Sequence, residues 1–146
     1  MNAELLHSED LLHDGKWQQM TATIAEVIAP GTFKGSDSRP IDKESIRFEK
    51  HPKVLVLNSI NRRILQIAAG TCVPGKWVGT QVKLYVATAT HFGLKDCPGL
   101  RIRAPKGATL PYNVRQQLDK ETDITGRAVH VATRDSVEKA SAASTD

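Results

Sequence analysis

The chain lacks any long hydrophobic run. None of its 146 residues belongs to an apolar stretch of about 18 residues, which excludes a membrane-spanning helix. The acidic first fifteen residues do not show the basic-then-apolar pattern of a secretion signal, so we expect a cytoplasmic protein. Only two cysteines are present, Cys72 and Cys97, and neither belongs to a CxxC motif. We therefore expect free thiols and no zinc site.

Catalytic motifs are missing as well. The sequence contains no GxSxG, no P-loop and no HExxH pattern. The acidic residues of the central part fall mostly in polar stretches, and Asp37, Asp42 and Glu44 form only a weak case for a two-metal nuclease. We expect a non-enzymatic protein that uses no metal and no cofactor.

Charge is present but unevenly distributed. Residues 1–15 carry four acidic side chains and no Lys or Arg, whereas residues 16–106 carry fifteen Lys and Arg against six Asp and Glu. Residues 107–146 carry five against six, so the net charge of +4 conceals a central part with a charge of +9. Such a surface attracts polyanions, although basic strand edges also keep ordinary sheets soluble.

Hydrophobic periodicity predicts five strands and one helix within this basic part. Apolar residues alternate with polar ones in the strands and recur at helical spacing in the helix, which begins at Asn58 or Ser59 and ends at Gly70. Glu26 interrupts the more apolar side of the first strand, which predicts a bulge there. The predicted strands occupy 16–29, 45–50, 53–58, 80–90 and 99–105, and the helix follows the third.

Three strands, one helix and two strands is the element order of the OB-fold, a five-stranded Greek-key barrel. The sequence therefore predicts an all-β-dominated, OB-fold-like barrel over residues 16–106, with a small open α+β sheet as the alternative. Residues 1–15 are predicted to form an acidic flexible arm. Residues 107–146 are predicted to form an extension with a short helix, LPYNVRQQLDKE, and a disordered tail.

Three motifs resemble a family of small phage-encoded, OB-fold-type proteins that bind single-stranded DNA in replication and recombination regions. The motifs are LVLNSINRRI at 55–64, KWVGTQVKLY at 76–85 and GLRIRAP at 99–105, and the resemblance spans about residues 20–106. Thr80 departs from the pattern, which has Lys after the Trp-x-Gly turn. The resemblance implies single-stranded DNA as the partner, together with replication and recombination proteins.

Binding of a single strand requires cations for the phosphates and planar groups for the bases. Arg101 and Arg103 share one face of a strand because side chains alternate with a period of two. Trp77, between Gly75 and Gly79, is interpreted instead as an anchor of the turn, and Phe48 as a core residue. The candidate nucleic-acid-binding residues are Arg47, Lys50, Lys53, Lys83, Tyr85, Arg101, Arg103, Phe33 and Phe92.

These observations favour non-sequence-specific binding of single-stranded DNA. A protein-interaction module built on the same barrel is the alternative, and general binding of single- and double-stranded DNA is a third hypothesis. The acidic arm is a candidate competitor for the basic groove or a contact for partner proteins. The sequence leaves the oligomeric state open, a dimer included.

Overall fold

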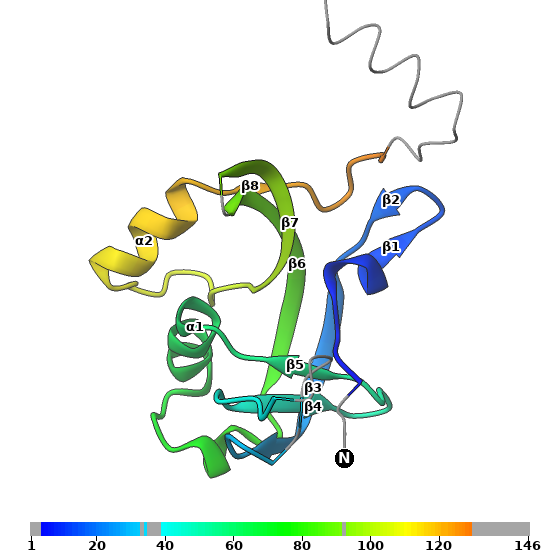
Figure 1. Cartoon of the computed structure of the whole chain (residues 1–146). Coiled ribbons are helices and arrows are strands. Elements are labelled where there is room, and N and C mark those ends of the chain that lie inside the picture. Colours follow the sequence, from blue (N-terminus) through cyan, green and yellow to red (C-terminus); the bar gives the residue numbers. More distant parts are fainter. Residues whose placement is uncertain (1–3, 33, 35–38, 92, 130–146) are drawn as a thin grey trace, which may run out of the picture.

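A strongly curled antiparallel sheet forms the body of the protein in the computed structural model, which describes residues 4–32, 34, 39–91 and 93–129 (Figure 1). Its main strands follow the order β5-β4-β3-β6-β7, so the first long strand, β3, lies in the middle. The bounds are β3 Met20–Ile28, β4 Ser45–Phe48, β5 Val54–Val56, β6 Gln81–His91 and β7 Leu94–Ile102. The prediction of a sheet-dominated protein with five main strands is confirmed.

The middle strand β3 bends where the sequence predicts it. The pairing of β3 with β4 shifts register between Ile24 and Glu26, which is the signature of a β-bulge. Ile24 is fully buried, while Glu26 is exposed. The bulge turns the charged side chain outward without moving the apolar residues of the strand away from the core, and the bend contributes to the curl of the sheet.

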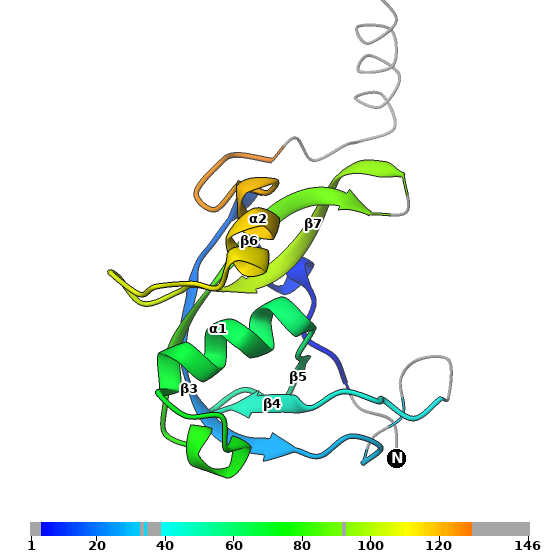
Figure 2. The same ribbon diagram turned by 90° about the vertical axis from the view of Figure 1, so that its left-hand side faces the viewer.

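Helix α1 (Ser59–Ala69) follows β5 and lies against the concave side of the curled sheet (Figure 2). The side chain of Asn58 caps it by accepting a hydrogen bond from the backbone N–H of Asn61, and Gly70 ends it with a positive φ of 73°. Ile64 and Leu65 are fully buried, as the helical spacing predicts. The polar side chain of Gln66 is also buried, with only 9% of the residue exposed.

The Trp77 turn is confirmed as an anchor of the fold. Trp77 ends a short 3-10 helix, Pro74–Trp77, and is fully buried in the core together with Phe48. Its indole Nε1 donates a hydrogen bond of 2.9 Å to the backbone carbonyl of Thr71. A buried tryptophan needs such a partner, and this bond attaches the loop after α1 to the core.

The N-terminal segment is part of the folded body, so the prediction of a flexible arm is wrong for residues 4–15. Leu6 and Leu11 are buried in the core. The backbone N–H of Leu6 donates to the carbonyl of Val54 at 2.8 Å, which covers part of the free edge of β5. A 3-10 helix at Ser8–Leu11 and a hairpin of β1 (Leu12–His13) and β2 (Lys16–Trp17) follow.

The segment after residue 106 also belongs to the folded body. Helix α2 (Tyr112–Asp119) confirms the predicted short helix and buries Val114 in the core. Strand β8 (Thr122–Asp123) then pairs with the distal half of β6. The proposed boundary at 106 is therefore wrong, because the packed unit continues to residue 129. The predicted disordered tail, 130–146, lies outside the described residues.

Strand β7 begins earlier than its sequence pattern indicates. The prediction placed the last strand at 99–105, yet β7 starts at Leu94 and includes Pro98. Pro98 pairs with Thr88 of β6 at a position where the backbone nitrogen points away from the partner strand. The missing N–H therefore costs no ladder hydrogen bond, and the proline blocks pairing at the outer edge.

No strand pairing joins β5 to β7 within the described part of the chain, so the sheet is curled but not closed by a continuous ladder. A side chain of α1 occupies this junction. Asn61, which is only 1% exposed, donates from Nδ2 to the carbonyl of Leu100 at 3.0 Å and accepts from the N–H of Ile102 at 3.0 Å. Its side-chain amide therefore supplies hydrogen-bond partners to two backbone groups at the edge of β7, as a neighbouring strand would. Sequence reasoning missed this role.

Candidate nucleic-acid interface

The outer face of β6 organises the candidate site. Val82, Leu84 and Val86 point into the core, as the alternation predicts. The residues between them point outward, so Gln81 and Lys83 are exposed and Tyr85 is half-buried. Ladder pairing sets Thr21 of β3 beside Lys83. Polar and basic side chains of two strands therefore meet on one surface.

Two adjoining hollows lie along this surface, with cavity volumes of about 350 Å³ and about 340 Å³. They share Thr21 and Gln81, so together they form one shallow depression, which we name the β3–β6 groove. The charged and histidine side chains that line it are Glu49, Lys50, His51, Lys83 and Arg103. The groove is therefore predominantly basic, with a single carboxylate near one end.

Lys50 and Lys83 are the uncompensated cations of the groove. Both are exposed, and neither takes part in any ion pair among the described residues. Lys50 lies in the turn between β4 and β5, and its backbone φ of 61° is a value that residues other than glycine seldom adopt. Because no described residue neutralises their charges, these two lysines can neutralise phosphate groups of a bound strand.

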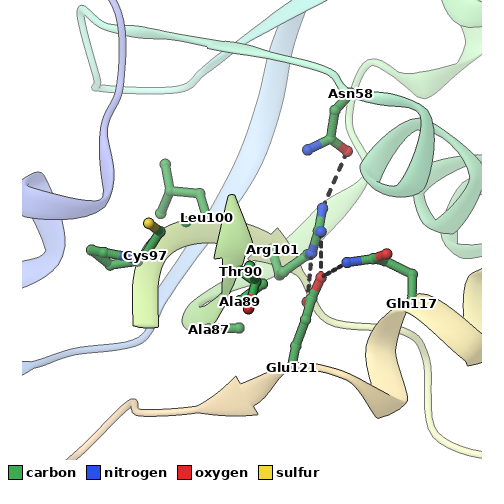
Figure 3. A pocket seen from close by; sticks show the side chains of 11 residues that line it. Asn58, Ala87, Ala89, Thr90, Cys97, Leu100, Arg101, Gln117 and Glu121 are labelled. Carbon is green, nitrogen blue, oxygen red and sulfur yellow. Dashed lines mark hydrogen bonds and ion pairs between the residues drawn. The ribbon is translucent and has the colours of Figure 1, made fainter. Parts of the chain in front are cut away.

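Arg101 differs from the outward-facing, available cation that the sequence predicts, because its side chain is mostly withdrawn from solvent and its charge is already paired. Its guanidinium forms a bidentate ion pair with Glu121, in which Nε donates to Oε1 at 2.8 Å and Nη2 donates to Oε2 at 2.5 Å. Nη1 also donates to Asn58 Oδ1 at 3.3 Å, and Gln117 donates to the same carboxylate of Glu121 (Figure 3). Only 13% of the Arg101 side chain and 4% of the Glu121 side chain are exposed.

Arg103 makes a second ion pair, with Asp123, at 2.8 Å. This pair is more open, since both side chains are 40% exposed. The guanidinium lies over the ring of Tyr85, 4.2 Å from the ring centre. Arg101 lies on β7 and Arg103 directly follows its last residue, while their carboxylates lie on the far side of β6. The two ion pairs, Arg101–Glu121 and Arg103–Asp123, therefore cross the outer face of β6 side by side, and we call them the two rungs. The prediction that the two arginines share a face is confirmed.

The carboxyl groups of the rungs have perturbed pKa values. Burial raises the pKa of Glu121, but hydrogen bonds from Arg101 and Gln117 outweigh it and bring that pKa below its usual 4.5. Burial likewise raises the pKa of Asp123, and the bonds from Arg103 and Thr125 lower it below 3.8. Burial, joined by the charge of Glu121, raises the pKa of the Tyr85 hydroxyl despite the two nearby arginines.

These lowered pKa values predict loss of stability in acid. A carboxyl group with a lower pKa in the folded state stabilises fully above its unfolded pKa, about 4 to 4.5, and loses this contribution as the pH falls through the folded value. We expect the urea midpoint to decline below about pH 4.5 and to decline less in Glu121→Gln/Asp123→Asn. Denaturation at several pH values tests this. An equally steep decline in the double variant would show that other groups control acid unfolding.

Two further basic candidates lie outside the β3–β6 groove. Arg47 pairs with Glu26 at 2.6 Å, and both side chains are partly exposed. Lys53 pairs with Asp10 of the N-terminal segment at 2.6 Å, away from the groove. The structure therefore brings together Lys50, Lys83, Arg103 and Tyr85 of the predicted set. The remaining candidates, Phe33 and Phe92, lie outside the described residues.

A separate cavity of about 320 Å³ lies beyond the rungs, between the β6–β7 hairpin and the segment after α2 (Figure 3). Small residues of the hairpin, including Ala87, Ala89 and Gly99, form one side, and Arg101 with Glu121 forms the other. The groups that sequence reasoning missed are the carboxylates facing the arginines. The spacing of Glu121 and Asp123, two residues apart as in Arg101 and Arg103, was the available signal.

Within the described residues, no group of three or more His, Cys, Asp or Glu side chains is arranged to hold a metal ion. Cys72 and Cys97 are free thiols. No helix in the described part of the chain is both long enough and apolar enough to cross a bilayer. Comparison of the chain with family models, curated proteins and solved structures finds no match.

Proposed function

We propose that this protein is a non-enzymatic, OB-like domain that binds single-stranded DNA with little sequence preference. The observation that carries the proposal is the β3–β6 groove, which is lined by uncompensated lysines and adjoins the stacked Arg103–Tyr85 pair. Cations along a groove with planar groups beside them are the combination that single-strand binding requires. The phage replication and recombination setting implied by the sequence resemblance belongs to the same proposal.

The strand pairing supports the OB-like part of the proposal. The first main strand pairs with the second and the fourth, the second with the third and the fourth with the fifth, while α1 lies between the third and fourth. A five-stranded, partly open sheet with this pairing is compatible with an OB-like barrel, and this compatibility supports the proposal. Two features differ from that fold: Asn61 bridges the junction of the third and fifth strands, and the groove lies on the first and fourth strands rather than the second and third.

A salt titration of fluorescently labelled oligo-dT, with a matched duplex in parallel, tests the proposal. We expect tighter binding of the single strand and a steep fall of affinity with salt, because neutralised phosphates release counterions. Lys50→Gln and Lys83→Gln should each reduce the slope of log K against log salt by about 0.7. Lys16→Gln is the matched control, since Lys16 is exposed on β2 and lines neither hollow.

Three outcomes would contradict the proposal. Absence of oligo-dT binding at low salt would overturn DNA binding and leave the protein-interaction module as the function to test. Equal affinity for the duplex would overturn the preference for a single strand. A slope that changes as much in Lys16→Gln as in Lys83→Gln would mean that the β3–β6 groove is not where the phosphates bind.

A further inference from the structure

Arg103 differs from the lysines of the groove in how its charge is placed. Its guanidinium carbon lies over the Tyr85 ring, 4.2 Å from the ring centre, and Nη2 donates a hydrogen bond to Asp123. The ring contact and the hydrogen bond together restrict the position of the planar group. The side chain is 40% exposed and lines the β3–β6 groove, so part of it is available to a ligand.

We infer that Arg103 is a stacking platform for an unpaired nucleobase and that it determines the preference for single-stranded over double-stranded nucleic acid. The inference rests on the proposed function. Guanidinium planes stack on bases much as aromatic rings do, and the positive charge adds a cation–π attraction. In a duplex the faces of the bases are already stacked on each other, so only a single strand can offer a base to Arg103.

The charges around Arg103 favour a base over a phosphate as its ligand. Asp123 already neutralises the guanidinium at 2.8 Å, and a phosphate approaching it would meet the same carboxylate. Lys83 has no such partner among the described residues and lines the same hollow as Arg103. A strand in this hollow can therefore place a phosphate at Lys83 while the neighbouring base stacks on Arg103.

Arg103→Lys separates the two roles because it keeps the charge and removes the plane. We expect it to weaken binding of oligo-dT about tenfold, as loss of one stacked base predicts. An abasic oligonucleotide of equal length keeps every phosphate and offers no base, so its affinity should be the same for the wild-type protein and Arg103→Lys. Lys83→Gln should weaken binding of both oligonucleotides by the same factor, since it acts on phosphate.

Tyr85→Phe, which keeps the ring, is the matched control for the platform and should bind oligo-dT as the wild-type protein does. Tyr85→Leu, which removes the ring beneath the guanidinium, should weaken oligo-dT binding without affecting the abasic strand. Tryptophan fluorescence of each variant verifies that the fold is intact.

The inference is overturned if Arg103→Lys binds oligo-dT as tightly as the wild-type protein, or if it weakens oligo-dT and abasic binding equally. In both cases the wild-type protein still binds the single strand, so the proposed function survives. Failure of the wild-type protein to bind oligo-dT at all would instead overturn the proposed function, and the inference with it.

Discussion

Replacement of Asn61 by alanine is expected to lower the free energy of unfolding by about 3 to 4 kcal/mol. The side-chain amide of Asn61 is 1% exposed and serves both the carbonyl of Leu100 and the N–H of Ile102. A buried backbone group that loses its partner costs about 1–3 kcal/mol, and here two groups lose theirs. The loss falls at the junction of β5 and β7, where no strand ladder among the described residues compensates for it.

Urea unfolding followed by the fluorescence of the buried Trp17 and Trp77 measures this change. Asn113→Ala is the matched control, because Asn113 is exposed on α2 and its loss should alter stability by no more than about 0.5 kcal/mol. Asn61→Asp keeps the acceptor for Ile102 but places a carboxylate oxygen against the carbonyl of Leu100, so it should also destabilise. Equal stability of Asn61→Ala and Asn113→Ala would show that the amide does not hold β7.

Arg101→Met is expected to lower the free energy of unfolding by about 3 kcal/mol or more. Its guanidinium compensates Glu121, whose side chain is 4% exposed, and removal of one member of a buried pair leaves the other charge without compensation. The effect is structural, so Arg101→Met should change the unfolding midpoint far more than it changes the salt slope of DNA binding by the folded protein.

A double-mutant cycle tests whether the uncompensated charge of Glu121 causes the loss of stability in Arg101→Met. Glu121→Met alone should also destabilise, whereas Arg101→Met/Glu121→Met should recover much of the loss, because an apolar pair of similar size carries no buried charge. Arg103→Met is the comparison at the open rung and should cost about 1 kcal/mol or less, since its pair with Asp123 is 40% exposed. Strict additivity in the Arg101 cycle would contradict direct coupling of the two charges.

Much of the sheet is predictable because its signals are local. The alternation of Val82, Leu84 and Val86 and the caps at Asn58 and Gly70 each act over a few neighbouring residues, and the structure confirms them. The packing of the two ends of the chain against the sheet was not predicted, although the short helix α2 was. Leu6 and Val114 lie in short segments with little periodicity, and they are buried only because the open edges and faces of the sheet need cover.

The candidate site was predicted only in part, because some of its features depend on neighbouring residues and others on contacts between distant segments. Strand period places Arg101 and Arg103 on one face, and in the structure the charges of both act on Tyr85. Whether the charges of these two arginines are neutralised depends on Glu121 and Asp123, each twenty residues further along the chain. Strand β8 carries Asp123 to the opposite edge of β6 from β7, and the chain just before it supplies Glu121. The sequence shows that such carboxylates exist, but not which arginine each one meets.

The sequence by itself determined the basic character of the central part, the order of strands and helix and the residues that face the core, because charge, propensity and periodicity are properties of neighbouring residues. Only the tertiary structure decided which cations stay available. Ion pairs across the sheet compensate Arg47, Lys53, Arg101 and Arg103, while Lys50 and Lys83 line the β3–β6 groove without an ion-pair partner among the described residues. A charge becomes a binding group or a structural one according to the partner that folding brings within a few ångströms, and that partner is set by packing between distant segments.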